Sequence, residues 1–285
     1  MKRREFIQSS AVAAAGLLAL PSFANVAMKK GKDEIGLQIY TLRDTIFKDP
    51  KGVLKQVSDF GYKKLETFAY RDGSIFGMPF ADFGKYIKDL GMKVTSGHYG
   101  LDQAKSDKWE KAVTDAKSIG QDYLVVPYLV ESDRKTIDDY KKVCAALNKA
   151  GEIAKKNGMK FGYHNHAFEF ETLEGQIPYD VMLKELDPKI VDMELDIFWV
   201  VNAGHDPIKL FEKHPGRFTQ WHVKDMDKSD KMRNANVGSG TIDWKNIFAN
   251  AKKSGMKHFY VEQETYPGAP IDSVGESIKY LKTIL

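Results

Sequence analysis

One short pattern recurs six times along the chain and constrains its fold more than any other feature. In each copy the end of an expected helix is followed by a glycine and then by β-branched and aromatic residues. Glycine favours the left-handed conformation just past a helix C-terminus, and the residues after it have the composition of a strand. The six glycines are Gly61, Gly91, Gly120, Gly158, Gly216 and Gly255.

The spacing of these glycines sets the number of strands. Neighbouring glycines lie 29 to 39 residues apart, which suits one strand and one helix, but Gly158 and Gly216 lie 58 residues apart, which suits two such units. A strand over residues 190–200 fills the long interval, and another over residues 35–42 precedes the series. The sequence therefore predicts eight strands that alternate with helices.

The segments between the strands have the periodicity of amphipathic helices, and several begin with a capping residue. The expected helices cover residues 49–60, 80–90, 133–156, 243–254 and 270–284. Parallel strands joined by crossover helices are buried on both faces, and eight such units fit one α/β domain, a closed (β/α)8 TIM barrel. An open doubly wound sheet is the main alternative. It usually carries a glycine-rich phosphate turn after its first strand, where this chain has "YTLRDTIF".

The N-terminus has the features of an export signal. Two adjacent arginines in a basic head precede an apolar run over residues 11–20, and Ser22 and Ala24 are placed as a cleavage site requires. The head resembles the twin-arginine type, which carries folded proteins across the bacterial inner membrane. The apolar run is too short to span a bilayer, which takes about 20 residues. We expect a periplasmic protein without stable membrane insertion, divided into a signal peptide (1–24), a linker (25–33) and the barrel (34–285).

Composition and charge exclude several classes of protein. Cys144 is the single cysteine, so an internal disulfide and a thiolate metal cluster are excluded, and its place in an expected helix predicts a buried side chain. The formal net charge is +4, and lysines are interspersed with acidic residues on the expected helix faces. This distribution indicates a solvated surface rather than a phosphate-binding stripe. The expected partner is a small carbohydrate and not a nucleic acid. Whether the protein forms a homo-oligomer is left open.

Polar residues gather late in the expected strands, where the active sites of such barrels lie. Charged groups inside apolar strands are costly unless they are paired or bind a metal, so a ring of them needs a shared purpose. In chain order the ring contains Gln38, Tyr40, Glu66, His98, His164, Asn165, His166, Glu194, Asp196, His222, Lys224, Asp225, Glu262 and Glu264.

A divalent cation would explain part of this ring. Asp196, His222 and Glu262 each end an apolar run on successive strands, and His164 lies one strand earlier as the natural fourth ligand. A shell of carboxylate and imidazole suits Mn, Zn, Fe or Co better than Ca. A single residue of this kind is more often a hydrogen-bonded rim residue, but four at matching depth favour a metal site.

Other residues have two interpretations. Glu194 and Glu264 could contact the metal ligands from a different depth, and the three histidines at 205, 214 and 258 fit loops or helix ends without a site role. Trp199, Trp221 and Trp244 are core or sugar-stacking residues, with core favoured. The loop over residues 234–248 either ends simply in a helix cap or closes over a ligand with its backbone N–H groups.

The motifs together resemble a known family, the sugar phosphate isomerase/epimerase group of xylose isomerase-like TIM barrels, which includes exported bacterial members. The resemblance extends from residue 34 to residue 285. It depends on "GLQIYTLRD", "GYKKLE", "GMKVTSGH", "YHNHAFEF", "MELDIFW", "WHVKD", "VGSGTIDW" and "YVEQE".

The resemblance implies a metal held by Glu, Asp, His and Glu from strands five to eight. Asp196, His222 and Glu262 match the last three of these ligands. The first ligand differs, because His164 stands where the family has its glutamate, with Glu169 as the alternative. Trp199 stands where related ketose epimerases carry a substrate-binding histidine.

These residues predict an enzyme that moves a proton beside a metal-bound sugar carbonyl. Return of the proton gives epimerisation or isomerisation, and loss of a β-substituent gives elimination. We expect a metal-dependent sugar isomerase or epimerase first, a lyase acting on a keto-glycoside or keto-sugar next, and a non-catalytic sugar-binding protein last. The charge disfavours a nuclease of the same fold. The expected catalytic residues are Glu262, His98, His166 and Lys224, and the expected substrate-binding residues are Tyr40, Glu66, Asn165 and Trp199.

Overall fold

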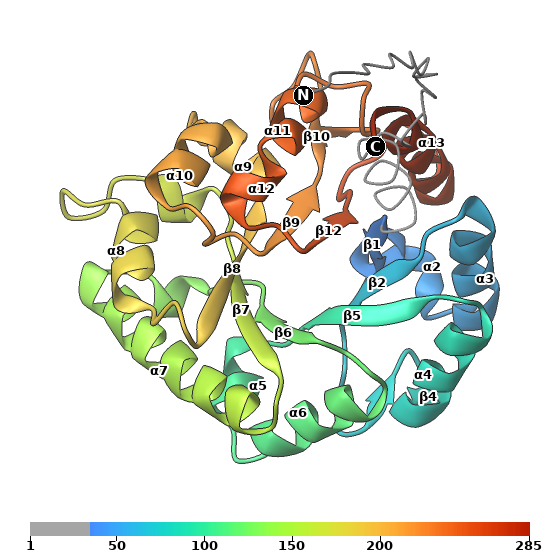
Figure 1. The fold of residues 1–285 in the computed structure, drawn as a ribbon, viewed down its shortest axis with the longest axis horizontal. Helices are drawn as coiled ribbons and strands as arrows, with labels where there is room; N and C mark the ends of the chain where they lie inside the picture. The colour runs from blue at the N-terminus through green and yellow to red at the C-terminus, as the bar shows by residue number, and fades with distance from the viewer. Residues whose placement is uncertain (1–34) are drawn as a thin grey trace, which may run out of the picture.

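Eight parallel strands close into a barrel in a computed structural model that describes residues 35–285. The strand order around the barrel is β1-β12-β9-β8-β7-β6-β5-β2, and the helices lie outside this ring (Figure 1). The predicted (β/α)8 barrel is therefore confirmed. The expected signal peptide and linker lie outside the described residues. The barrel strands are β1 (Gly36–Gln38), β2 (Lys64–Thr67), β5 (Lys93–His98), β6 (Tyr123–Val126), β7 (Lys160–His164), β8 (Val191–Asp196), β9 (Gln220–Val223) and β12 (His258–Val261).

The outer layer consists of helices that follow the strands. Its helices of seven or more residues are α3 (Pro50–Phe60), α4 (Phe80–Asp89), α6 (Trp109–Ser118), α7 (Ile137–Lys156), α8 (Pro178–Glu185), α10 (Pro207–Lys213) and α13 (Pro270–Ile284). Shorter helices are η1 (Ile39–Leu42), α2 (Arg43–Ile46), α5 (Leu101–Lys105), η2 (Glu131–Asp133), η3 (Phe168–Phe170), α9 (Ile197–Asn202), α11 (Trp244–Ala249) and α12 (Ala251–Ser254). Two small antiparallel pairs add β3 (Ser74–Ile75) with β4 (Met78–Pro79) and β10 (Asp225–Met226) with β11 (Asn234–Ala235).

The six glycines act as the sequence predicted. All of them have φ values between 70° and 99°, which is the left-handed region that a side chain makes unfavourable. Each lies between the end of one helix and the start of a barrel strand. The strands are buried almost throughout, because the barrel interior covers one face and the helices cover the other.

Four expected elements have boundaries that differ from the expectation. The helix expected over residues 133–156 begins at Ile137, because the Thr136 side chain caps it. The strand expected over residues 190–200 ends at Asp196, whose carboxylate accepts a hydrogen bond from Trp199 N and so begins α9. The first strand ends at Gln38, whose side chain accepts from Tyr40 N, and residues 39–42 form η1. The helix expected over residues 243–254 is two helices, because the backbone at Asn250 (φ −97°, ψ 5°) leaves helical geometry.

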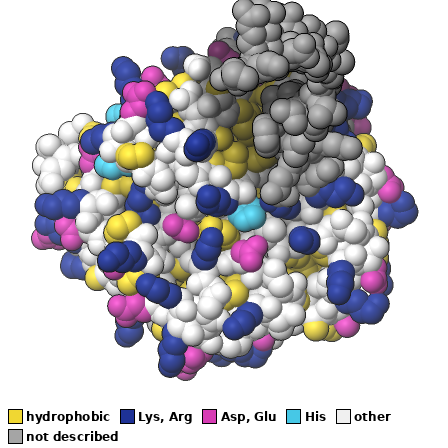
Figure 2. Space-filling view, in the orientation of Figure 1, with side chains coloured by type: hydrophobic (Ala, Val, Ile, Leu, Met, Phe, Trp, Pro, Cys, Tyr) yellow, Lys and Arg dark blue, Asp and Glu magenta, His cyan; other side chains and the backbone are white. Residues whose placement is uncertain are grey.

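The core contains the expected apolar residues. Cys144 on α7 is buried, and Trp221 and Trp244 are fully buried, so both tryptophans belong to the core. Among residues 35–285 no helix is long and apolar enough to cross a membrane. On the face seen in Figure 2, Lys and Arg side chains lie among Asp and Glu rather than in one continuous stripe.

Candidate metal centre and active site

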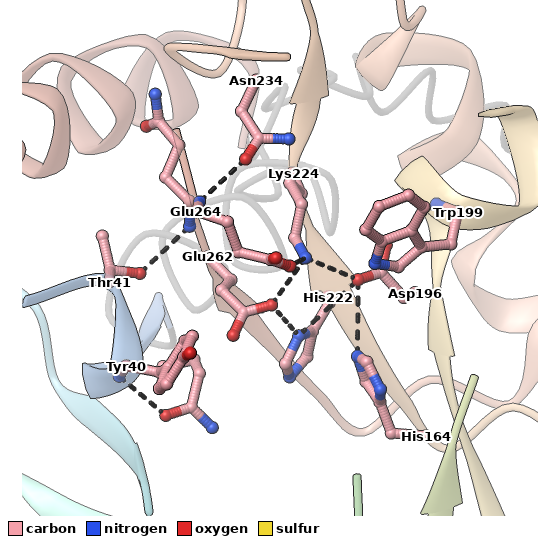
Figure 3. Close-up of polar contacts among 12 residues, drawn as sticks. Tyr40, Thr41, His164, Asp196, Trp199, His222, Lys224, Asn234, Glu262 and Glu264 are labelled. Atoms are coloured by element: carbon pink, nitrogen blue, oxygen red, sulfur yellow. Dashed lines mark hydrogen bonds and ion pairs between the residues drawn. The ribbon is translucent and has the colours of Figure 1, made fainter. Parts of the chain in front are cut away.

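Four side chains converge at the carboxyl ends of four successive strands. His164 ends β7, Asp196 ends β8, His222 lies in β9 and Glu262 directly follows β12. One donor atom from each lies within 4.8 Å of the other three, close to the span of about 4 Å between opposite donors on one ion. Figure 3 shows these side chains pointing toward one another. The set is two imidazoles and two carboxylates, which suits a divalent transition metal.

His164 is oriented as a metal-binding histidine would be. Its Nδ1 lies 3.1 Å from the backbone oxygen of Pro127, and a carbonyl can only accept, so this nitrogen carries the hydrogen. Its Nε2 then faces the cluster, where it is buried without a hydrogen-bond partner. Asp196 Oδ2 lies 3.4 Å from it. An unpartnered buried nitrogen of this kind fits a cation ligand.

Charge around the cluster also fits a divalent ion. Lys224 directly follows β9 and is fully buried. Its Nζ lies 3.0 Å from Asp196 Oδ2 and 2.8 Å from Glu262 Oε2. It also pairs with Glu264. Three carboxylates therefore surround one ammonium. Burial favours the neutral His222 ring, but Glu262, Glu194 and Glu66 raise the pKa of His222 well above its ordinary value, so its imidazolium offsets part of the remaining negative charge when no cation is bound. Burial opposes ionisation, but Lys224 holds the pKa of Asp196 and of Glu262 well below the ordinary range.

A second group lies beneath the first and shares His222 with it. His222 Nδ1 is 2.9 Å from Glu262 Oε2, whereas Nε2 is 2.6 Å from Glu66 Oε2. Gln38 donates to the same Glu66 oxygen at 2.9 Å. Glu66, His98, Glu194 and His222 also have donor atoms close enough to hold an ion. A carboxylate on the outer nitrogen of a metal-bound histidine fixes the ring, and Glu66 occupies that position relative to His222.

His98 connects this lower group to the pocket. Its Nε2 lies 3.2 Å from Glu66 Oε2 and 3.0 Å from Glu194 Oε2. Burial favours the neutral ring, but the two carboxylates raise the pKa of His98 to about 9. His98 also lines the pocket, so its imidazole would contact a molecule bound there. Glu194 is fully buried beside it and does not line the pocket.

A cavity of about 510 Å³ opens above the converging donors. His164 and Glu262 form part of its floor, and Glu264 and His166 line it as well. Tyr40 also lines this cavity, which fits its predicted contact with substrate. Its position on η1 rather than on a strand places its ring at the entrance.

The expected substrate contact of Asn165 is wrong. Its side chain is fully buried, its Oδ1 accepts from Asp196 N at 3.0 Å, and its Nδ2 donates to Asp196 O at 3.3 Å. The alternation of side chains along β7 directs Asn165 away from the cavity that His164 faces. Asn165 therefore holds the end of β8 and the position of Asp196. Glu66 is likewise fully buried and contacts His222 rather than the cavity.

The alternative ligand Glu169 lies outside the cluster. Its Oε1 accepts from the Tyr163 hydroxyl and its Oε2 accepts from His166 N at 2.8 Å. Burial raises the pKa of Glu169 to about 8. Of the two candidates, the structure places His164 and not Glu169 among the donors. Burial also lowers the pKa of His166 to about 2, with help from His164 and Lys224, so its ring is neutral near pH 7.

Trp199 lies beside the site on α9, partly buried against the core. The Lys224 ammonium is 5.5 Å from its ring centre, and the His166 ring is 5.6 Å away. Trp199 does not line the cavity, so the structure favours its core interpretation over substrate stacking.

The Asp225 side chain holds the loop over residues 234–248 in place. The Asp225 carboxylate accepts from the backbone N–H of Gly238, Gly240 and Ile242. A Cβ on Gly240 would lie 2.3 Å from Asp225 Oδ1, so glycine is required there. These N–H groups therefore donate to Asp225 within the protein and are not available to bind a ligand.

Fold and donor set together define a class of protein: a (β/α)8 barrel with a metal site at the carboxyl ends of its strands. A family model described as the xylose isomerase-like TIM barrel matches residues 54–284, and the chain belongs to this family. A sugar phosphate isomerase/epimerase from Parabacteroides distasonis ATCC 8503 is similar, with 32% identity and a TM-score of 0.77 over 87% of this chain and 97% of that one.

Two further relatives are informative. An inosose dehydratase from Clostridium tetani (strain Massachusetts / E88) is 27% identical over 181 residues, which are 57% of this chain and 60% of that protein. The match thus spans about three fifths of that relative. The IOLI protein, which carries a bound zinc atom, shares the fold with a TM-score of 0.68 and 16% identity over 88% of this chain and 99% of that one. The predicted resemblance is confirmed, and the prediction of an enzyme agrees with these relatives.

Two residues important to the site were not singled out from the sequence. Tyr128 lines the cavity from the segment after β6, where it follows a proline and has no charged neighbour in sequence to draw attention. Pro127 supplies the carbonyl that orients His164. Every residue has a backbone carbonyl, so residue type does not show which carbonyl accepts this hydrogen bond. Only the barrel geometry identifies it.

Proposed function

We propose that this protein is a divalent-metal-dependent lyase that removes a proton beside the carbonyl of a keto-sugar derivative and expels the β-substituent. The observation that carries the proposal is the convergence of His164, Asp196, His222 and Glu262 under a cavity. When bound there, a cation would polarise the carbonyl and lower the cost of the enolate.

The cavity is asymmetric in a way that suits elimination. Its two lining carboxylates, Glu262 and Glu264, both come from the end of β12, whereas His98 and His164 come from β5 and β7. Each of these two strands lies three places from β12 around the barrel. Inversion of a carbon needs a similar base on each face of the substrate. Elimination needs a base on one side and an acid on another, which this arrangement provides.

In this proposal a carboxylate removes the proton from carbon and a histidine donates a proton to the leaving group. Glu264 or Glu262 accepts the proton from carbon. Lys224 is fully buried, does not line the cavity and pairs with both carboxylates, so it positions them rather than contacting the substrate as expected. His98 is held by Glu66 and Glu194 through its Nε2, and its other ring nitrogen, Nδ1, donates a proton toward the departing oxygen. The similarity to an inosose dehydratase supports a lyase.

An isomerase or epimerase is the second candidate, because the 32%-identical relative from Parabacteroides distasonis bears that description. Both reactions begin with removal of the same proton. They differ in whether the substrate loses a group.

The substrate is proposed to be an unphosphorylated carbohydrate met in the periplasm. This follows from the expected export signal at residues 1–24, since phosphosugars are mainly cytoplasmic.

The test uses protein reconstituted with Mn or Zn and methyl 3-keto-glucoside in deuterium oxide. A lyase releases methanol and forms an unsaturated ketone that absorbs in the ultraviolet. An isomerase or epimerase incorporates deuterium at one carbon without release of methanol. Binding with neither release nor exchange would contradict both enzymatic functions and indicate a sugar-binding protein.

A further inference from the structure

The cavity is polar at its floor and aromatic at its entrance. His164 and Glu262 on the floor are 2% and 5% exposed, whereas Tyr40 and Tyr128 at the entrance are 38% and 44% exposed. All four side chains line the same cavity. Large aromatic side chains left in water around one opening indicate a surface that a ligand covers.

The Tyr40 side of the entrance is fixed to the floor. Gln38 accepts from Tyr40 N and donates to Glu66, so one side chain joins the entrance to the group beneath His222. The Tyr40 ring packs edge-on against Phe68, with ring centres 5.1 Å apart at 86°. The Arg43 guanidinium lies 4.7 Å from the Tyr40 ring centre. The Tyr40 ring is therefore held in place before any ligand arrives.

Residues with strained backbone conformations support the Tyr40 side of the entrance. Ala69 lines the cavity with φ 65°, and Phe76 packs against Phe68 at 5.3 Å with φ 50°. The left-handed region is unfavourable for a residue with a side chain. Strain of this kind persists where the surroundings require one backbone conformation, and here that conformation presents Phe68 and Ala69 to the cavity.

The Tyr128 side is built in a similar way. Its ring packs edge-on against His166 at 5.1 Å and against Phe168 at 5.5 Å. The Arg134 guanidinium covers Phe168 at 3.7 Å. Tyr128 thus stands on an aromatic base between the floor histidines and solvent.

We propose that Tyr40 and Tyr128 form a binding site for the ring of the leaving group, so that the substrate is a keto-glycoside rather than a free keto-sugar. This inference rests on the proposed lyase function. The apolar face of a sugar or other ring would pack on the tyrosines, while the keto-sugar reaches the floor. A leaving group as small as water would leave both tyrosines uncovered, and a cavity of about 510 Å³ accommodates more than one ring.

The chemistry balances without an oxidant or reductant. The leaving group is on C1, so the proton is removed from C2 and the carbonyl must be at C3 to acidify that C–H bond. The C2–H electrons form a C1–C2 double bond while the C1–O bond breaks and the departing oxygen takes a proton. The products are an unsaturated keto-sugar and a free alcohol.

The experiment compares cyclohexyl and methyl 3-keto-glucoside, whose alkoxide leaving groups are similar in basicity. We expect kcat/KM to be about tenfold or more higher for the cyclohexyl compound. Tyr40→Ala and Tyr128→Ala should each reduce that ratio severalfold, while Tyr128→Phe retains it because the ring remains. Met232→Ala is the matched control, since Met232 is 62% exposed and does not line this cavity.

Binding of the unoxidised cyclohexyl and methyl glucosides by calorimetry separates the two proposals. If neither keto-glycoside reacts but the cyclohexyl glucoside binds more tightly and Tyr128→Ala removes the difference, the aromatic site stands and the lyase function fails. If both keto-glycosides react with the same kcat/KM, the lyase function stands and the aromatic site is refuted. Unchanged ratios in both tyrosine variants would also refute it.

Discussion

His222 is the residue at which two groups of carboxylates meet. One ring nitrogen faces Glu262 and the metal ligands, and the other faces Glu66 beneath them. His164 shows the same division, with one nitrogen toward Pro127 and the other toward the cluster. In His164 a fixed hydrogen bond on one nitrogen leaves the other to the proposed metal site, whereas both nitrogens of His222 contact carboxylates and a cation would take the place of one of these contacts.

Glu66→Gln tests this role of a buried carboxylate. Removal of the charge should weaken metal affinity about 10- to 100-fold while the ligands themselves stay in place. Titration of the metal-free protein with Zn in competition with a chelator measures the affinity. Glu276→Gln on α13, whose partner is the exposed Lys279, is the control and should bind as the wild type does. Equal affinity in Glu66→Gln would contradict the role.

Glu169 gives a prediction about pH. Its pKa rises from 4.5 to about 8 on burial, so the folded protein holds this proton more tightly than the unfolded chain does. The resulting stability is complete below pH 4.5 and is lost as the pH rises toward 8. Glu169→Gln, which mimics the protonated group, should therefore gain on the order of 3 kcal/mol relative to wild type between pH 5 and pH 8. Urea unfolding at both pH values, with equal metal saturation, measures the difference, and parallel curves would refute it.

Sequence pattern locates the strand ends but not the partners of each side chain. Alternation along β7 correctly separates the directions of His164 and Asn165. It does not show that the Asn165 amide is taken by the backbone of Asp196, because that contact depends on how β7 and β8 align. The sequence likewise does not show that Glu66 contacts His222, which lies far away in the chain, because this contact also depends on how the barrel strands align.

At the scale of the elements, the glycines predict the order of strands and helices well. The helix cap made by Asp196 was not foreseen, because a residue ending a strand and beginning a helix lies inside a continuous apolar run. Asp225 is a second residue whose structural role was not foreseen. It looked like a site residue, but it anchors the loop between β11 and α11 through three backbone N–H groups.

Asp225→Ala should destabilise the protein. The variant leaves four buried or part-buried N–H groups without this acceptor, those of Met226, Gly238, Gly240 and Ile242, and we expect a loss of about 3 kcal/mol in the free energy of unfolding. Asp227→Ala is the control, because Asp227 accepts hydrogen bonds only near the surface among the described contacts. Chemical denaturation compares the two, and an equal effect would contradict the anchoring role.

At the scale of the whole molecule, the barrel brings donors from distant parts of the chain to one end. The family and its fold follow from residues 54–284, whereas the reaction depends on a few side chains at the mouth. Export is a separate property of the whole chain and is predicted from residues 1–24.

Replacement of Arg3 and Arg4 by lysine should retain the protein in the cytoplasm, because the twin-arginine pair is what that export route reads. Cell fractionation with an antibody to the barrel measures the distribution. The single substitution Lys2→Arg serves as the conservative control, and this variant should be exported. Periplasmic protein from the double variant would contradict the proposed route.

The central claim is that His164, Asp196, His222 and Glu262 hold one divalent cation under the cavity. Metal analysis after reconstitution with Mn or Zn tests it most directly, with His222→Ala measured beside the wild type. We predict about one equivalent in the wild type and a loss of most of it in the variant. Less than about a tenth of an equivalent in the wild type, or full metal content in His222→Ala, would contradict the claim.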